Sequence, residues 1–334
     1  MRVLSLFDGM ACGYEALLRA WIQIEKYYAS EIDKYAIQIA MKNHPDIIQV
    51  WDVTKLKGED FKDVDMIIGW SPCQGFSMAW KMLNFNDPRS KLFFEFVRLV
   101  KEIKPKYFLL ENVKMKKEFQ NVISEYMWVQ PIEINSALVS AQNRKRLYWT
   151  NIPNISIPED KGILLKDVLE GNVDEKYYLT ERQIEMINNW WGRDNPIQLA
   201  KTWEEKMWTL TTHTWKLSNG LKLVSVRGGE LRIRQATKQW YIVANEWDRD
   251  KNNRWVHTDK SYCLPANPMS DRWQMVVEWL RIRKLTPLEC ERLQTMPDNY
   301  TEWVSDTRRY KMLWNWWTCD VIAHIFSFIK TNNG

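Results

Sequence analysis

The segment Met66-Ile67-Ile68-Gly69-Trp70-Ser71-Pro72-Cys73-Gln74 joins a short apolar run to a loop that carries a cysteine. The run over 66–69 is typical of a buried β-strand. A cysteine directly after proline, on a loop at the end of such a strand, has the setting of a nucleophile. For Cys73 alone, a buried structural cysteine is an equally good interpretation.

Outward from this loop, the first half of the chain alternates strand-like runs with helical patterns. We expect strands over 3–6, 26–30, 65–68, 107–110, 132–138 and 147–150, and helices over 14–22, 34–43, 91–103 and 119–126. Strands that alternate with helices predict an α/β fold, built on a mostly parallel, doubly wound sheet.

After residue 152 the pattern changes. Segments 164–169 and 180–190 have helical patterns, whereas 194–277 is polar and basic, with strand-like runs at 221–226, 241–244 and 274–277. A helix over 283–293 follows, with Thr286 as N-cap, Pro287 at its first position and Glu289 closing a capping box. The last helix covers 320–329. We expect one domain over 1–180, an inserted smaller domain over 181–280, and a return to the first domain over 281–330.

Composition narrows the class of protein. The net charge of +5 favours a polyanionic partner only mildly, because many basic enzymes have the same balance. Five scattered cysteines do not suggest a disulfide framework, and the four histidines pair with no cysteine at zinc spacing, so we expect no metal. No apolar run approaches the ~20 residues of a membrane helix, and the N-terminal run is too short for a signal peptide. We expect a monomeric, cytoplasmic protein.

The segment from Phe7 to Gly13 has the features of a nucleotide-binding turn. Gly9 and Gly13 let the backbone turn and approach a ligand closely, and a helix that starts here favours an anionic group. Glu31, at the end of the second strand, suits hydrogen bonds to ribose hydroxyls. The G-x-G-x-x-G fingerprint of nicotinamide dehydrogenases is absent.

Four blocks occur in a characteristic order. They are Phe7-Asp8-Gly9, Ser71-Pro72-Cys73-Gln74, Glu111-Asn112-Val113 and Gln142-Asn143-Arg144-Lys145-Arg146. Together they resemble the DNA (cytosine-5-)-methyltransferase family of phages and bacteria, over residues 1–152 and 281–330. Ala29-Ser30-Glu31 and the segment 92–96 are also similar to the catalytic domain of animal de novo methyltransferases.

The resemblance implies a Rossmann-like fold, a catalytic domain with an inserted target-recognition domain, and a covalent mechanism. It assigns Cys73 as the nucleophile at carbon 6 of cytosine, Glu111 as the acid at nitrogen 3, and Arg146 at oxygen 2, with Arg144 supporting. The target base must be flipped out of double-stranded DNA, which the basic inserted domain would hold.

The resemblance also implies S-adenosyl-L-methionine as cofactor. Phe7 would pack on the adenine, Glu31 would hold the ribose, and Asp52 would read the adenine amine, although Asp52 alone is more simply a turn cap. The other residues expected at this site are Asp8, Gly9, Met10, Cys12, Gly13, Ile32, Val53, Pro72, Asn315 and Trp317.

The chain has 20 tryptophans and only 12 glycines, whereas average glycine usage of about 7% would give roughly twice as many glycines. The family favours small residues, mostly glycine, where this chain has Trp51, Trp70, Trp314 and Trp316. We therefore expect weak cofactor binding, and a catalytically impaired DNA-binding protein stays an alternative. A tRNA cytosine-5 methyltransferase is another, which the long basic insertion disfavours. Restriction-modification and phage self-protection fit equally.

Overall fold

The computed structural model describes residues 1–70, 88–180 and 281–329, and a set of short strands between 181 and 280. These strands are β9 (Ile197–Gln198), β10 (Thr211–Thr212), β11 (Tyr241–Val243), β12 (Trp247–Arg249), β13 (Trp255–His257), β14 (Ser261–Tyr262) and β15 (Met275–Glu278). The helix expected over 180–190 and the strand expected over 221–226 lie outside the described residues. The division into three segments stays a prediction.

One seven-stranded sheet, in the order β3-β2-β1-β4-β5-β8-β6, organises the fold. Its parallel strands are β3 (Ile48–Gln49), β2 (Lys26–Ser30), β1 (Arg2–Leu6), β4 (Met66–Trp70) and β5 (Tyr107–Val113). Strand β8 (Lys145–Thr150) pairs antiparallel with both β5 and β6 (Ile132–Asn135). The strand order reverses between β1 and β4, so the predicted doubly wound α/β sheet is confirmed, with one antiparallel strand near its edge.

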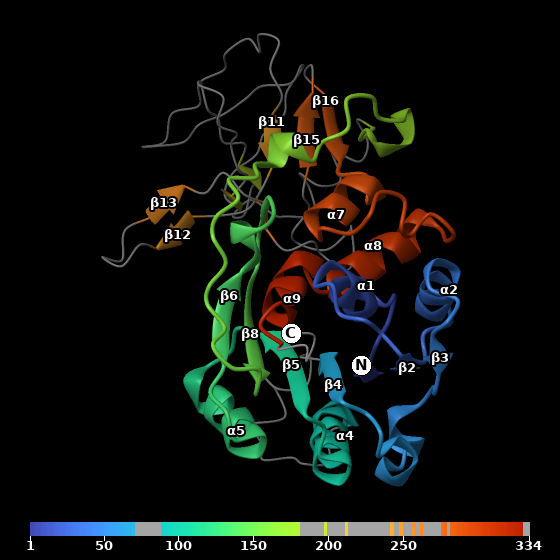
Figure 1. The fold of residues 1–334 in the computed structure, drawn as a ribbon. Helices are drawn as coiled ribbons and strands as arrows, with labels where there is room; N and C mark the ends of the chain where they lie inside the picture. The colour runs from blue at the N-terminus through green and yellow to red at the C-terminus, as the bar shows by residue number, and fades with distance from the viewer. Residues whose placement is uncertain are drawn as a thin grey trace.

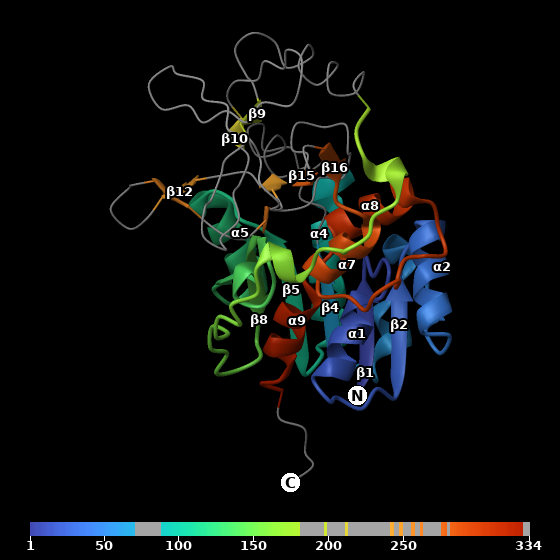
Figure 2. The same cartoon turned by 90° about the horizontal axis from the view of Figure 1, so that it is seen from above.

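Helices cover both faces of this sheet (Figure 1). They are α1 (Cys12–Arg19), α2 (Lys34–Asn43), α4 (Pro88–Ile103), α5 (Lys117–Met127), α7 (Pro287–Leu293), α8 (Asp306–Asn315) and α9 (Cys319–Phe326). Seen from above, the C-terminal helices α7 and α9 lie on the same side of the sheet as α1 (Figure 2). Segments from the two ends of the chain therefore build one layer.

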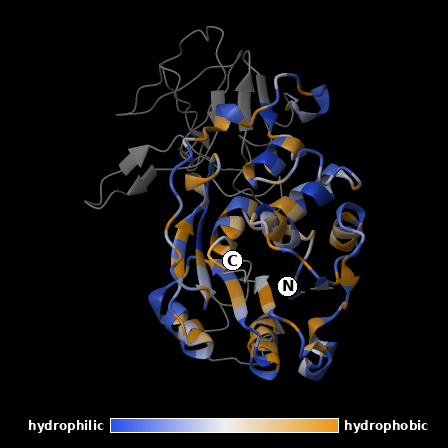
Figure 3. Ribbon diagram, in the orientation of Figure 1, coloured by the Kyte–Doolittle hydropathy of each residue, from blue (hydrophilic) through white to orange (hydrophobic). Residues whose placement is uncertain are grey.

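The core divides into two clusters, one on each face of the sheet. Val3 packs with α1, α2 and α9, whereas its neighbour Leu4 packs with α4 and α5. This alternation follows from the period of two in a strand. Figure 3 shows the same pattern, with hydrophobic residues along the strands and mixed helices outside them. Both faces of the central strands are thus buried.

The helix expected over 14–22 is α1, which ends at Arg19, and the helix expected over 320–329 is α9, which ends at Phe326. Three other expected elements differ more. The helix expected over 283–293 begins at Pro287, because Arg281–Lys284 forms strand β16, which pairs with β15. The helix expected over 164–169 is only the 3-10 turn Leu165–Asp167. The strand expected over 132–138 ends at Asn135, whose side chain caps a 3-10 turn.

Candidate active site

The turn after β1 lies at the carboxyl edge of the sheet, next to the point where the strand order reverses. Phe7, Gly9 and Ala11 all have left-handed backbone, with φ of 58°, 59° and 66°. The Gly9 N–H donates to Glu31 Oε2 at 2.9 Å, which fastens the turn to the end of β2. Ligands of open α/β sheets bind outside the carboxyl ends of the strands at such a reversal. The geometry therefore places a candidate binding site over this glycine turn.

Two carboxyl groups support the turn, that of half-buried Glu31 and that of buried Asp8. Glu31 also accepts hydrogen bonds from the backbone N–H groups of Ile32 and Asp33, at 2.7 and 2.8 Å. Burial raises the pKa of Glu31, and these N–H groups oppose the rise. Asp8 accepts a hydrogen bond from the Tyr27 hydroxyl at 2.6 Å, and burial raises the pKa of Asp8 to about 7.

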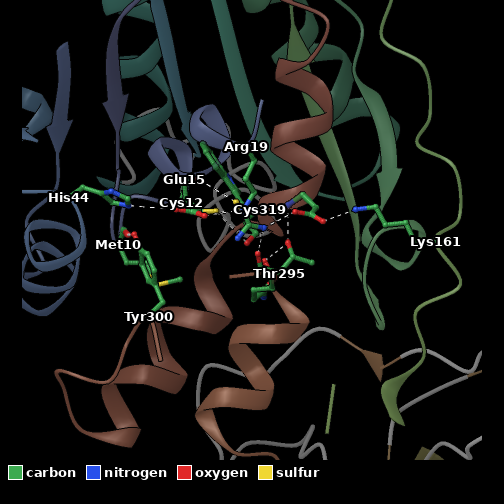
Figure 4. A network of polar contacts seen from close by, with 12 residues as sticks. Met10, Cys12, Glu15, Arg19, His44, Lys161, Thr295, Tyr300 and Cys319 are labelled. Carbon is green, nitrogen blue, oxygen red and sulfur yellow. Dashed lines mark hydrogen bonds and ion pairs between the residues drawn. The ribbon is translucent and has the colours of Figure 1, made fainter. Parts of the chain in front are cut away.

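The C-terminal segments are tied to α1 by a network of polar contacts (Figure 4). The Tyr300 hydroxyl donates to the Met10 carbonyl at 2.8 Å. Arg19 donates to Glu15 at 3.0 Å and to Asp320 of α9 at 2.7 Å. These contacts hold the C-terminal layer against the glycine turn, so residues near 316 can reach the site.

A second cluster surrounds Glu111, which lies within β5 rather than after it. Arg146 Nε lies 3.0 Å from Glu111 Oε1, and the Trp317 Nε1–H donates to Glu111 Oε2 at 3.2 Å. Burial raises the pKa of Glu111, against the lowering effects of Arg146, Arg144 and the Trp317 N–H. The structure thus brings together Glu111 and Arg146, which are distant in sequence.

Arg144 has a different set of partners. It is buried, and its guanidinium donates to the carbonyl oxygens of Trp314 at 3.3 Å and Trp316 at 2.7 Å. Arg144 therefore fixes the backbone between α8 and α9. The contact of Trp317 with Glu111 was not expected, because Trp317 was assigned to the cofactor. Only the buried position of an indole N–H hints at such a contact.

The other candidate residues have varied positions. Cys73 and Pro72 lie outside the described residues. Met10 and Cys12 are fully buried in the core, so their side chains face no open site. Gly13 packs against Ile68 and Tyr27, and Val53 lies in the core. Ile32 is exposed, and Asn315 is the last residue of α8.

Asp52 is a turn cap. It accepts hydrogen bonds from the Thr54 N–H at 2.9 Å and the Thr54 hydroxyl at 2.8 Å. These bonds hold the pKa of Asp52 below its ordinary value. The contacts of Asp52 are therefore those of a turn cap, which is the simpler of the two interpretations of this residue.

The indole of Trp316 fills the space over the glycine turn. A Cβ built on Gly9 would overlap the Trp316 ring, so the ring lies directly against this backbone. Trp70, at the end of β4, packs edge-on against Trp316 with ring centroids 6.0 Å apart. The Trp70 Nε1–H donates to the Phe7 carbonyl at 2.7 Å. The Trp316 ring, with Trp70 beside it, therefore occupies the space directly against the Gly9 backbone.

Among the residues that the structure describes, no group of histidine, cysteine, aspartate or glutamate side chains could hold a metal ion. In the same parts of the chain, no helix is long and apolar enough to span a bilayer.

The strand order and the glycine turn are those of a Rossmann-like α/β fold. A solved methyltransferase structure from Entamoeba histolytica shares this fold, with a TM-score of 0.64 and 18% identity over 98% of this chain and 97% of that chain. The chain belongs to the C-5 cytosine-specific DNA methylase family, whose family model matches residues 1–331.

Two relatives match over most of the chain. The orphan methyltransferase M.SPRI of Bacillus phage SPR is 28% identical, over 98% of this chain and 96% of the relative. The type II methyltransferase M1.ScrFI of Lactococcus lactis subsp. cremoris is 30% identical, over 94% of this chain and 74% of the relative. The predicted family and enzyme class are therefore confirmed.

Proposed function

We propose that this site methylates carbon 5 of a flipped cytosine in double-stranded DNA, through a covalent adduct with Cys73. We propose S-adenosyl-L-methionine as the methyl donor. It would bind when the space over Gly9 is open. The observation that carries the proposal is the ion pair of buried Glu111 with partly buried Arg146 at the carboxyl edge of the sheet. The phage and type II relatives support a role in DNA modification within a phage-infected or bacterial cytoplasm.

The pair suits the acid side of this chemistry. A carboxyl group whose pKa is raised by burial can hold a proton and deliver it to nitrogen 3 of the ring. The guanidinium of Arg146 stays charged and suits the carbonyl oxygen of the same ring. The Trp317 N–H on the second carboxylate oxygen fixes the orientation of Glu111. These contacts support Glu111 as the acid and Arg146 as the electrophilic group.

The covalent step then balances. The Cys73 thiolate forms a bond to carbon 6, the electron pair of the 5,6 double bond forms a 4,5 double bond, and the pair of the 3,4 double bond moves to nitrogen 3, which takes the Glu111 proton. Carbon 5 becomes nucleophilic. If carbon 5 takes a proton from water and then loses its original hydrogen as a proton, elimination of the Cys73 thiolate, with return of the nitrogen 3 proton to Glu111, leaves a solvent hydrogen at carbon 5. This exchange needs no methyl donor.

Tritium release from carbon 5 therefore tests the proposal without the cofactor. We expect the chain to release tritium from a duplex with tritiated cytosine, and Cys73→Ser to release none. Glu111→Gln should slow release by about 10²–10⁴-fold, the usual contribution of a general acid. Release that is unchanged in Cys73→Ser would overturn the mechanism, and release only from tRNA would favour the RNA alternative.

A further inference from the structure

In the part of the chain that the structure describes, three tryptophans have a backbone conformation that favours glycine. Trp21, Trp51 and Trp128 have φ of 57°, 61° and 58°. Their side chains are 92%, 59% and 64% exposed. A residue with a Cβ is strained by about 1–2 kcal/mol in this left-handed region, whereas glycine is not. An exposed indole gains little packing in return.

The C-terminal end of α1, at Trp21, has the hydrogen bonds of a helix end that favours glycine. The Ile22 N–H donates to the Leu17 carbonyl and the Trp21 N–H to the Leu18 carbonyl, both at 3.0 Å. This pattern is a Schellman motif, and Trp21 holds the position that is usually glycine. Trp128 likewise follows the last residue of α5 in left-handed backbone. Both helix ends are built for glycine.

Other tryptophans in the chain have roles that only an indole fills. Trp149 is fully buried, and its Nε1–H donates to the Ser124 hydroxyl at 2.9 Å. Trp317 is buried, and its Nε1–H donates to Glu111. Buried tryptophans normally satisfy their N–H group in this way. We call Trp149 and Trp317 the packed tryptophans.

Trp316 also stands at a position that suits glycine, as Trp21, Trp51 and Trp128 do. The reason is the space that its ring occupies over Gly9, not backbone strain. Its backbone is extended, but its ring lies on Gly9 at the reversal of strand order. Arg144 holds the Trp316 carbonyl, and Trp70 packs against the ring from the end of β4. The ring is therefore fixed from two sides in the position where a bound nucleoside would contact the glycine turn.

We propose that Trp21, Trp51, Trp128 and Trp316, the glycine-site tryptophans, stand where this fold uses glycine, and that the Trp316 indole closes the cofactor site. The identity of the excluded ligand, a nucleoside sulfonium, rests on the function proposed above. The closure itself rests on the contacts of Trp316 alone. Replacement of this one residue by glycine opens the volume over Gly9.

Calorimetric titration with S-adenosylhomocysteine, the stable demethylated product, tests this closure. We expect Trp316→Gly to bind at least about 100-fold more tightly than the unchanged chain, since a site that is open less than ~1% of the time loses affinity in proportion. Trp316→Ala opens nearly the same volume and should behave alike. Trp21→Gly makes the same change at a remote, exposed helix end and is the matched control, with binding unchanged.

Equal affinity of folded Trp316→Gly, Trp316→Ala and the unchanged chain would overturn the proposal, and so would tight binding by the unchanged chain. Folding is checked by circular dichroism, and Trp316→Ala remains informative if the glycine variant does not fold. Tritium release from carbon 5 is measured on the same samples. Its absence would count against the proposed function, whereas unchanged titration with intact release would count against the closure alone.

Discussion

Replacement of Asp8 by asparagine should change how stability depends on pH. Asp8 is buried under the glycine turn, where its pKa is about 7 instead of the ordinary 3.8, chiefly because of burial. Since the folded state binds the extra proton, its contribution to stability is complete below about pH 4 and is lost as the pH rises through 7. A difference of about 3 pKa units corresponds to about 4 kcal/mol.

Urea unfolding, followed by circular dichroism between about pH 4 and pH 8, measures this effect. The free energy of unfolding of Asp8→Asn, relative to the unchanged chain, should rise by about 4 kcal/mol across this range. Asp52→Asn is the control: its pKa is lowered by Thr54, so it titrates below the range and its difference should stay flat. A constant difference for Asp8→Asn would refute the assigned burial of this carboxyl.

Three further predictions concern stability and the gene. Glu289→Gln should cost about 3–5 kcal/mol in urea unfolding, because it removes the carboxylate charge that lies 2.8 Å from the fully buried Arg283 guanidinium. Trp21→Gly should raise stability by about 1–2 kcal/mol, whereas Trp149→Gly should lower it by about 3–5 kcal/mol; a loss in the first variant would contradict the assigned strain. The codon UGA is read as tryptophan in some genetic codes and as glycine in others, whereas UGG encodes tryptophan. Sequencing of the gene should therefore show UGA at the glycine-site tryptophans and UGG at the packed tryptophans.

Elements with local signals could be predicted from sequence. Strand β2 and helix α2 have the predicted bounds, and Asp33 caps α2 by accepting from the Tyr35 N–H. The capping box of Thr286 and Glu289 is confirmed as well. Each of these features depends on residues within a few positions of one another. The local sequence pattern therefore contains the interactions that form it.

Features that depend on distant partners could not be predicted. Residues 281–284 form a strand because β15 lies beside them, and no local pattern indicates that pairing. Arg144 donates to a carbonyl 170 residues away, so an alternating pattern alone could not separate its role from that of Arg146. Sequence composition indicated that the tryptophans were unusual, but only the fold places the Trp316 ring on Gly9.

The two halves of the proposed reaction should separate in this chain. The strain at the three exposed glycine-site tryptophans sums to roughly 3–6 kcal/mol, which a domain with about 5–15 kcal/mol of stability can tolerate. None of the three rings belongs to either core cluster, so the sheet and the Glu111–Arg146 pair keep their packing. Tritium release should therefore proceed while methyl transfer fails, and Trp316→Gly should restore transfer from labelled S-adenosylmethionine. Equal methyl transfer by the unchanged chain and by Trp316→Gly would mean that the Trp316 indole does not block binding of the methyl donor.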